Sequence, residues 1–187
     1  MRVISGQMKG KKLKSVAGMS TRPTSDKVKE AIYQILGPYF DGGVVLDLYA
    51  GSGAMGIEAL SRGMDKGIFN DKTGQAIRTI KENLRETGLM EQSEVYRNDA
   101  QKALNHLAER NLQFHLIILD PPYQKQAIPE NLSSICELDL LHAHGVILCE
   151  HDRKVELPEK IDGIVKVRNL AYGDTVISLY EWSELHA

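Results

Sequence analysis

The chain has 187 residues, of which 42% are hydrophobic and 26% are charged, a composition typical of a single soluble globular domain. No apolar run approaches the roughly 20 residues of a membrane helix. The N-terminus lacks the apolar core of a secretory signal, so we expect a cytoplasmic protein with no membrane partner. Cys136 and Cys149 stand alone without metal-binding spacing, and we expect both to be reduced and buried.

A strongly basic segment begins the chain, although the net charge is only −2. Residues 1–29, which we call the basic arm, carry eight basic side chains and one acid, so the arm is +7 and the rest of the chain is −9. A basic arm on an acidic body predicts contact with a polyanion such as nucleic acid, and the alternative is a solvated tail. The candidate phosphate-binding residues are Lys9, Lys11, Lys12, Lys14, Arg22 and Thr24. For Arg22, a structural ion pair is the alternative.

The first predicted elements are a short hairpin that turns near residues 9–11 and a helix that begins at Thr24 or Ser25 and ends at residues 37–38. Strands and helices then alternate. Strands are expected at about 44–49, 67–70, 94–98, 115–120 and 146–149, and helices at about 54–63, 73–87, 100–110 and 126–139. This alternation predicts a doubly wound, mainly parallel α/β sheet.

The C-terminal part departs from that alternation. Strands are predicted at residues 164–170 and 175–182, and the short connection between them favours an antiparallel hairpin. We divide the chain into a basic N-terminal extension, residues 1–40, and a main domain, residues 41–187, because the one organisational boundary separates the basic region from the body.

A glycine-rich loop follows the first strand of the predicted sheet, with the pattern G-x-G-x-x-G at Gly51, Gly53 and Gly56. The pattern alone fits NAD as well as S-adenosylmethionine. Asp71 lies twenty residues after Gly51, where a carboxylate can accept hydrogen bonds from ribose hydroxyls. Asp47 would repel a pyrophosphate but attract the ammonium and sulfonium of S-adenosylmethionine, unless it only caps nearby loop amides.

A further acid, Asp99, follows the third strand of the predicted sheet. It could accept the amine of adenine while the Ala100 N–H meets a ring nitrogen, or it could simply cap the next helix. Acids at successive strand ends predict a site for a cationic, adenosine-bearing ligand. The candidate cofactor-binding residues are Asp47, Tyr49, Ala50, Gly51, Ser52, Gly53, Asp71, Asp99 and Ala100.

The segment Asp120-Pro121-Pro122-Tyr123 follows a buried apolar strand. Two successive prolines fix φ twice and remove two N–H donors, which makes the segment stiff and leaves its carbonyl oxygens without neighbouring donors. A planar base with an exocyclic amine needs acceptors for the NH2 group and a ring to stack on. We therefore take Asp120, Pro121, Pro122 and Tyr123 as the candidate catalytic residues. The alternative is a proline-terminated strand followed by an ordinary loop.

Motifs across nearly the whole chain resemble those of the RsmD family of class I S-adenosylmethionine-dependent methyltransferases. The matching segments are residues 2–6, 22–24, 46–53, 58–63, 119–123 and 172–173. Two positions depart from the family pattern: Tyr49 stands where Phe is more frequent, and Asp71 stands where Glu is common. The shorter Asp side chain has a shorter reach to the ribose.

The resemblance implies a Rossmann-like class I methyltransferase fold: a seven-stranded, mainly parallel sheet with an antiparallel C-terminal hairpin. It implies methyl transfer from S-adenosylmethionine to N2 of one guanine in 16S ribosomal RNA, with S-adenosylhomocysteine as product. The family acts on small-subunit assembly particles, so we expect the small ribosomal subunit or its assembly intermediate as partner and a monomeric enzyme. No metal is expected, because the sulfonium is already activated and the histidines show no ligand spacing.

Three other functions are compatible with parts of the sequence. A DNA adenine-N6 methyltransferase would share residues 120–123, but 187 residues leave no room for a target-recognition domain. An NAD-dependent oxidoreductase is supported by the glycine pattern alone. A non-catalytic RNA-binding assembly factor could keep the fold without turnover.

Overall fold

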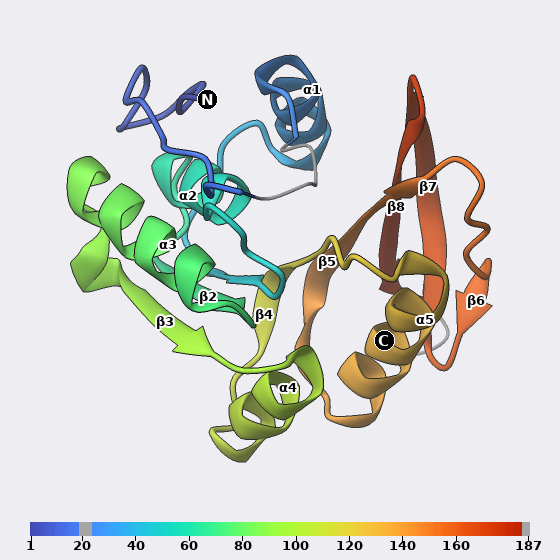
Figure 1. Cartoon of the computed structure of the whole chain (residues 1–187). Coiled ribbons are helices and arrows are strands. Elements are labelled where there is room, and N and C mark those ends of the chain that lie inside the picture. Colours follow the sequence, from blue (N-terminus) through green and yellow to red (C-terminus); the bar gives the residue numbers. More distant parts are fainter. Residues whose placement is uncertain (19–23, 185–187) are drawn as a thin grey trace. The chain divides into compact units, whose positions relative to one another are not determined.

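The computed structural model describes residues 1–18 and 24–184 (Figure 1). They form two compact units, Met1–Asn98 and Asp99–Ala187. Each unit contains strands and helices, as the predicted alternation requires. The boundary expected near residue 40 divides the basic N-terminal extension from the main domain, and it stays a prediction.

The first unit contains three parallel strands in the order β3-β2-β1. Its elements are α1 (Asp26–Leu36), β1 (Val44–Asp47), α2 (Ala54–Ser61), β2 (Lys66–Asp71), α3 (Gly74–Thr87), the 3-10 helix η1 (Met90–Gln92) and β3 (Ser93–Arg97). The interior residues of β2 are buried, which is typical of a strand covered on both faces. Ser25 caps α1, since its Oγ accepts the N–H of Val28 at 3.2 Å, as predicted.

The basic arm begins with the expected hairpin. Arg2 pairs with Lys12 in an isolated antiparallel bridge, and the Val3 N–H donates to the Lys11 carbonyl at 2.9 Å. The turn covers residues 5–10, so it begins a few residues before the predicted position near residues 9–11. Val3 and Leu13 are buried and anchor the two sides of the hairpin.

The second unit has the strand order β4-β5-β8-β7-β6. Its elements are α4 (Ala100–Glu109), β4 (Phe114–Leu119), α5 (Gln124–Glu137), β5 (Leu141–Asp152), β6 (Lys160–Ile161), β7 (Ile164–Tyr172) and β8 (Thr175–Trp182). β4 and β5 are parallel, whereas β5, β8, β7 and β6 pair antiparallel. The predicted C-terminal hairpin is therefore confirmed as β7 and β8 (Figure 1).

Two features of the strands correct the expectations. The described residues contain eight strands rather than seven, because the two-residue β6 pairs with Ile164 and Val165 of β7. A strand that short has no periodicity to detect. β5 also begins at Leu141, five residues before the predicted start, and its pairing with β4 is irregular near Gly145. Among the described helices, none is both long enough and apolar enough to cross a bilayer.

Candidate functional site

The glycine loop, residues 48–53, joins β1 to α2 and is tied to the end of β2. The Gly51 N–H donates to Oδ2 of Asp71 at 2.9 Å, and the Ala50 N–H donates to the Asn70 carbonyl at 2.8 Å. Gly51 and Gly53 have φ values of +57° and +84°, in the left-handed region that favours glycine. These two glycines are therefore needed for the shape of the loop, whatever it binds.

Asp71 shapes this loop through both carboxylate oxygens. While Oδ2 accepts from Gly51, Oδ1 accepts the Thr73 N–H at 3.0 Å and the Thr73 hydroxyl at 3.3 Å. A carboxylate offers about four acceptor positions, so a ribose hydroxyl would use the remaining capacity of this partly exposed group. The ribose contact stays a prediction, and the role in holding Gly51 is observed.

Asp47 is buried at the end of β1, with 3% of its surface exposed. Its Oδ2 accepts the N–H of Gly56 at 3.0 Å, within the first turn of α2. This contact is the capping role that was the alternative for Asp47, and attraction to a cationic ligand stays a prediction. Gly56 itself is constrained by packing, because a Cβ there would lie 2.5 Å from the Phe69 ring and 3.2 Å from Asp47 Oδ2.

Asn83 on α3 contacts the glycine loop, and no sequence motif indicated it. Its Nδ2 donates to the Ser52 carbonyl at 2.9 Å and to the Lys14 carbonyl at 3.0 Å, and its Oδ1 accepts the Lys14 N–H at 2.8 Å. The side chain is fully buried. The sequence feature that could have indicated Asn83 is its position as a polar residue on the apolar stripe of this helix, beside Ile80 and Leu84.

The remaining candidate cofactor residues differ in exposure and in role. Tyr49 and Ala50 follow β1, with Tyr49 partly exposed and Ala50 buried. In the second unit, Asp99 is the N-cap of α4 and Ala100 is the first helical residue. Asp99 Oδ1 accepts the Lys102 N–H at 2.9 Å, which is the capping role considered as its alternative. Contact with adenine stays a prediction for both Asp99 and Ala100.

The candidate catalytic segment joins β4 to α5 in the second unit. β4 is buried through Leu119, whereas Asp120 and Pro122 are exposed and Pro121 is buried. Tyr123 is the N-cap residue of α5, and 79% of its surface is exposed. A carboxylate and an aromatic ring are therefore exposed after β4, and the catalytic roles of these residues stay predictions.

The candidate RNA-binding residues are not equivalent. Lys9, Lys11 and Lys12 are exposed around the hairpin turn, and none of them forms an ion pair with any residue that the structure describes. Lys14 pairs instead with Glu82 of α3, which raises the pKa of its ammonium group. Arg22 lies outside the described residues. Thr24 is partly exposed and directly precedes the cap of α1.

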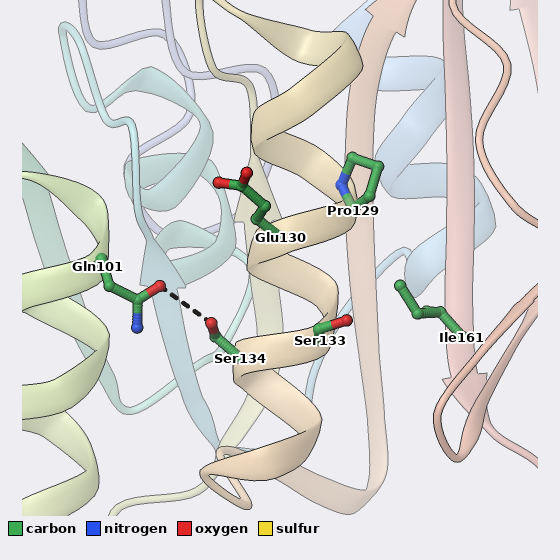
Figure 2. A pocket seen from close by; sticks show the side chains of 6 residues that line it. All are labelled: Gln101, Pro129, Glu130, Ser133, Ser134 and Ile161. Atoms are coloured by element: carbon green, nitrogen blue, oxygen red, sulfur yellow. Dashed lines mark hydrogen bonds between the residues drawn. The ribbon is translucent and has the colours of Figure 1, made fainter.

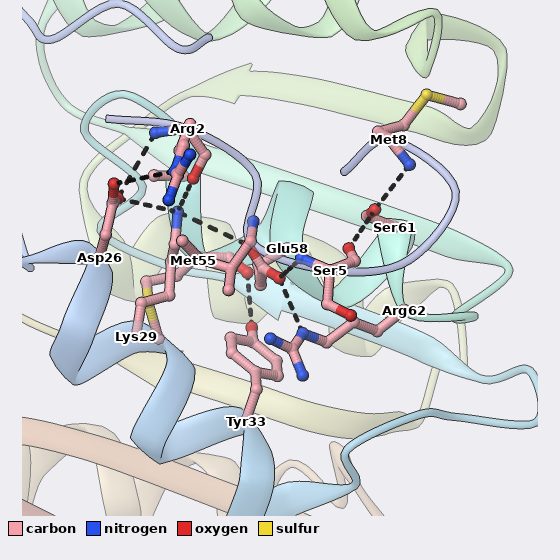
Figure 3. A network of polar contacts seen from close by, with 12 residues as sticks. Arg2, Ser5, Met8, Asp26, Lys29, Tyr33, Met55, Glu58, Ser61 and Arg62 are labelled. Atoms are coloured by element: carbon pink, nitrogen blue, oxygen red, sulfur yellow. Dashed lines mark hydrogen bonds and ion pairs between the residues drawn. The ribbon is translucent and has the colours of Figure 1, made fainter. Parts of the chain in front are cut away.

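A buried network of charges, which sequence reasoning missed, connects the N-terminal hairpin to α2 (Figure 3). The Glu58 carboxylate accepts the N–H groups of Ile4 at 2.9 Å and Ser5 at 3.1 Å. It also accepts the Nε–H of Arg62 at 2.7 Å, and the Lys29 ammonium lies 3.6 Å away. Glu58 therefore joins α1, α2 and the hairpin through a single side chain.

Lys29 is part of this network rather than of the exposed basic surface. It is 1% exposed and donates to the Arg2 carbonyl at 2.7 Å. Burial lowers the pKa of the Lys29 ammonium, and the carboxylates of Glu58 and Asp26 oppose that shift. Lys29, one of the basic residues of the arm, therefore stabilises the fold from the interior.

Ser61 makes a second connection between α2 and the hairpin (Figure 3). Its hydroxyl donates to the Ser5 carbonyl at 2.7 Å and accepts the Met8 N–H at 2.9 Å, and its carbonyl accepts the Gln7 N–H at 2.9 Å. Gly6 passes so close that an added Cβ would lie 1.9 Å from the Ser61 carbonyl oxygen. The motifs at residues 2–6 and 58–63 thus form one structural joint.

Tyr33 links α1 to the beginning of α2. Its hydroxyl donates to the Met55 carbonyl at 2.5 Å, and burial raises the pKa of this phenol. The Arg62 guanidinium lies 5.1 Å from the centre of the Tyr33 ring, and its Nη1 donates to the Pro38 carbonyl at 3.2 Å. Helix α1, which begins within the basic arm, is therefore fixed to α2, the helix that follows the glycine loop.

A hollow of about 460 Å³ lies elsewhere in the second unit (Figure 2). It is lined by Gln101, Pro129, Glu130, Ser133, Ser134 and Ile161. The Ser134 hydroxyl donates to the Gln101 Oε1 at 3.0 Å across one side. None of the candidate catalytic or cofactor-binding residues lines this hollow.

Known proteins match nearly the entire chain. Residues 1–181 match the family described as conserved hypothetical protein 95. The relative named "Putative rRNA methyltransferase YlbH" from Bacillus subtilis (strain 168) is 52% identical over 181 residues, which cover 97% of this chain and 98% of the relative. "Ribosomal RNA small subunit methyltransferase D" from Haemophilus influenzae is 33% identical over 180 residues, covering 90% of this chain and 92% of that protein.

The fold is also shared with a solved structure named "Putative methyltransferase yhhF from Escherichia coli". The TM-score is 0.81, the sequence identity is 27%, and the alignment covers 98% of each chain. The fold is accordingly that of the Rossmann-like class I methyltransferases, as expected from the motifs. Because the family model spans all but the last residues, this chain belongs to the conserved hypothetical protein 95 family, the RsmD family.

Proposed function

We propose that this protein is a ribosomal RNA methyltransferase that transfers a methyl group from S-adenosylmethionine to the exocyclic N2 of one guanine in 16S ribosomal RNA. The observation that carries the proposal is the exposed Asp120 and Tyr123 pair at the end of buried β4, in a chain whose relatives are named as ribosomal RNA methyltransferases. The proposed acceptor is the small ribosomal subunit or its assembly intermediate, and the enzyme acts as a monomer.

The glycine loop supports the assignment of the cofactor. A Cβ built on Gly51 would meet no atom within 4 Å, so a ligand can approach the backbone there. Asp47 and Asp71 place carboxylates beside this loop, which suits a ligand with cationic groups and ribose hydroxyls. In the proposal, residues 49–53 hold the methionine part, Asp71 the ribose, and Asp99 with Ala100 the adenine. When bound, the cofactor supplies an activated methyl group.

The residues that follow β4 would prepare the acceptor nitrogen. The lone pair of a guanine N2 is delocalised into the ring, and the nitrogen must pyramidalise before it can attack. Asp120 and the Pro121 carbonyl would accept its two N–H groups, favour that geometry and stabilise the positive charge that develops. Pro122 keeps the segment stiff and adds no competing donor. Asp120 or water would then take the proton that the nitrogen releases.

Tyr123 would hold the base. Its ring is exposed, so a base can stack on it and be kept in line with the methyl group. The target guanine must leave its own stack, either by flipping or because it lies in a loop. Replacing Tyr123 with Phe should preserve this function, whereas Ala should weaken RNA binding by about 1–3 kcal/mol.

The basic N-terminal extension, residues 1–40, would contact RNA, and residues 41–187 would form the catalytic domain. Lys9, Lys11 and Lys12 are the most available phosphate contacts because they are exposed around the turn. Such contacts position the RNA without reading its sequence. Lys14 would have to leave Glu82 to take part. Arg22 and Thr24 complete the proposed surface.

Labelled S-adenosylmethionine offered with three acceptors tests this function. The acceptors are small ribosomal subunits from a strain that lacks the matching activity, the same RNA stripped of protein, and duplex DNA. N2-methylguanosine in the digested subunits is the expected product. N6-methyladenine in the DNA would instead indicate the DNA methyltransferase, and absence of transfer to all three, with the cofactor still bound, would favour a non-catalytic assembly factor.

A further inference from the structure

The side chain of Asn83 connects two segments to which the proposed function gives different ligands. On one side, its amide pairs with both the N–H and the carbonyl of Lys14, in the basic arm. On the other side, its second Nδ2 hydrogen bond reaches the carbonyl of Ser52, between the two left-handed glycines of the loop. A primary amide has two N–H donors, and both are used here.

The arm segment around Lys14 is firmly placed on α3. Leu13 and Val16 are buried on either side of Lys14, and the Lys14 ammonium pairs with Glu82, the residue that precedes Asn83. The loop is equally constrained, because Gly51 donates to Asp71. Asn83 thus lies between two ordered segments rather than beside a mobile one.

Movement of either segment would leave part of the buried amide without a partner. An unsatisfied polar group in the interior is strongly unfavourable, so the bridged arrangement is favoured when both Lys14 and Ser52 are in place. A ligand that favours this position of one segment therefore also favours this position of the other. The expected cooperativity is positive, which means that each ligand increases the affinity for the other.

We propose that Asn83 is a positioning residue that couples RNA binding at the basic arm to cofactor binding at the glycine loop. The inference rests on the proposed function, because it takes the arm as an RNA surface and the loop as the cofactor site. RNA held by Lys9, Lys11 and Lys12 fixes the hairpin that leads into Lys14, and Lys14 fixes the Asn83 amide that holds Ser52. By linkage, cofactor binding strengthens RNA binding by the same factor.

The coupling is measured with S-adenosylhomocysteine, which binds without turnover. Equilibrium dialysis of the labelled compound gives its dissociation constant for the full-length protein, with and without unmethylated small ribosomal subunits. Subunits should tighten binding to the wild-type protein by about fivefold or more. For Asn83→Ala and for the isosteric Asn83→Asp, which loses both Nδ2 donors, the ratio of the two constants should be close to one.

Thr87→Val is the matched control on the same helix. Thr87 is buried, and its hydroxyl donates only to the Asn83 and Leu84 carbonyls within α3, so its loss weakens the helix without breaking the bridge. The ratio should stay at the wild-type value in this variant. With saturating subunits, Asn83→Ala should also raise KM for S-adenosylmethionine about fivefold while kcat is retained.

Two results would overturn the coupling: equal S-adenosylhomocysteine affinity with and without subunits in the wild-type protein, or a wild-type ratio in both Asn83 variants. The proposed function is tested separately, by identifying the methylated nucleoside in the digested subunits. Subunits that gain N2-methylguanosine without any change in S-adenosylhomocysteine affinity would reject the coupling alone. A different product, or none, would reject the proposed function.

Discussion

The Nε–H of Arg62 donates to the carboxylate of Glu58 at 2.7 Å, and both side chains are withdrawn from solvent (Figure 3). The same carboxylate accepts the backbone N–H groups of Ile4 and Ser5. A buried carboxylate that serves two cations and two amides is difficult to replace, because each partner would lose its compensation. The start of the basic arm therefore depends on α2 for its position.

Replacing Glu58 with Gln tests this dependence. The amide would keep the shape but leave the Arg62 and Lys29 cations buried without their shared counter-charge, so the free energy of unfolding should fall by about 3–5 kcal/mol. Urea denaturation measures the change. Glu94→Gln is the control, since it breaks the partly exposed pair with Lys66 and should cost about 0–1 kcal/mol. Equal losses would show that the Glu58 network is no stronger than a surface pair.

Gly6 and Gly10 form a matched pair for testing the joint between the hairpin and α2. Their φ values are +90° and +87°, so alanine should cost about 1–2 kcal/mol of backbone strain at either position. An added Cβ meets the Ser61 carbonyl oxygen at 1.9 Å from Gly6 and nothing within 4 Å from Gly10. Gly6→Ala should therefore be clearly less stable than Gly10→Ala and should expose the hairpin to proteolysis. Similar stability and similar cleavage of the two variants would contradict the joint.

Local patterns were sufficient to predict most of the elements. The apolar runs of β1 and β4 are buried, Ser25 caps α1, and the connection after Tyr172 forms the antiparallel turn. Each of these features depends on neighbours a few residues apart, which the sequence displays directly. Strand β6 was not predicted, because a strand of two residues is too short to show a periodic pattern.

The parts of the site that sequence reasoning missed depend on contacts between distant positions. In the sequence, Lys29 is one of the eight basic residues of the arm and Glu58 belongs to the motif at residues 58–63, and only the fold brings them together in the interior. Asn83 contacts Lys14, 69 positions away, through a backbone that has no sequence signature. For Asp99 the sequence left two roles open, contact with adenine and a helix cap, and the observed contact is the cap. Contacts between distant positions therefore required the structure, whereas a cap could be proposed from neighbouring residues.

His151 predicts how stability depends on pH. Its Nε2 lies 2.8 Å from the Ser178 hydroxyl and its Nδ1 lies 3.0 Å from the Asp152 carbonyl, and burial lowers its pKa in the folded state. As pH falls below about 6.5, the unfolded chain binds this proton before the folded protein does, so stability falls. The loss continues until pH reaches the lowered pKa.

Thermal unfolding at pH 7 and pH 5 measures this contribution. The drop in Tm should be smaller for His151→Gln than for the wild-type protein, and a difference of about 1 kcal/mol would correspond to roughly 2–4 °C. His106→Gln, on the exposed face of α4, is the control and should keep the wild-type drop. An unchanged drop in His151→Gln would assign the pH dependence to other groups.

The exposed lysines of the hairpin should control the salt dependence of RNA binding. Neutralising Lys9, Lys11 and Lys12 together should lower the slope of log K against log salt by roughly 2 to 3, since each phosphate contact contributes about 0.7–0.9. Filter binding over a range of salt concentrations gives the slope. A triple alanine variant of Arg153, Lys154 and Lys160 removes the same charge from the second unit and should change the slope less. Equal slopes in the two variants would remove the hairpin from the RNA surface.

Asp120 gives the most direct test of the proposed chemistry. Asp120→Ala should lower kcat by about 10²–10³-fold, because the acceptor for the developing positive charge is lost, and leave the affinity for S-adenosylhomocysteine within about twofold. Single-turnover methyl transfer and equilibrium dialysis measure the two quantities. Glu130→Ala, which removes an exposed acid from α5, should keep wild-type turnover. Near-normal turnover in Asp120→Ala would mean that the segment after β4 holds the base without taking part in the transfer.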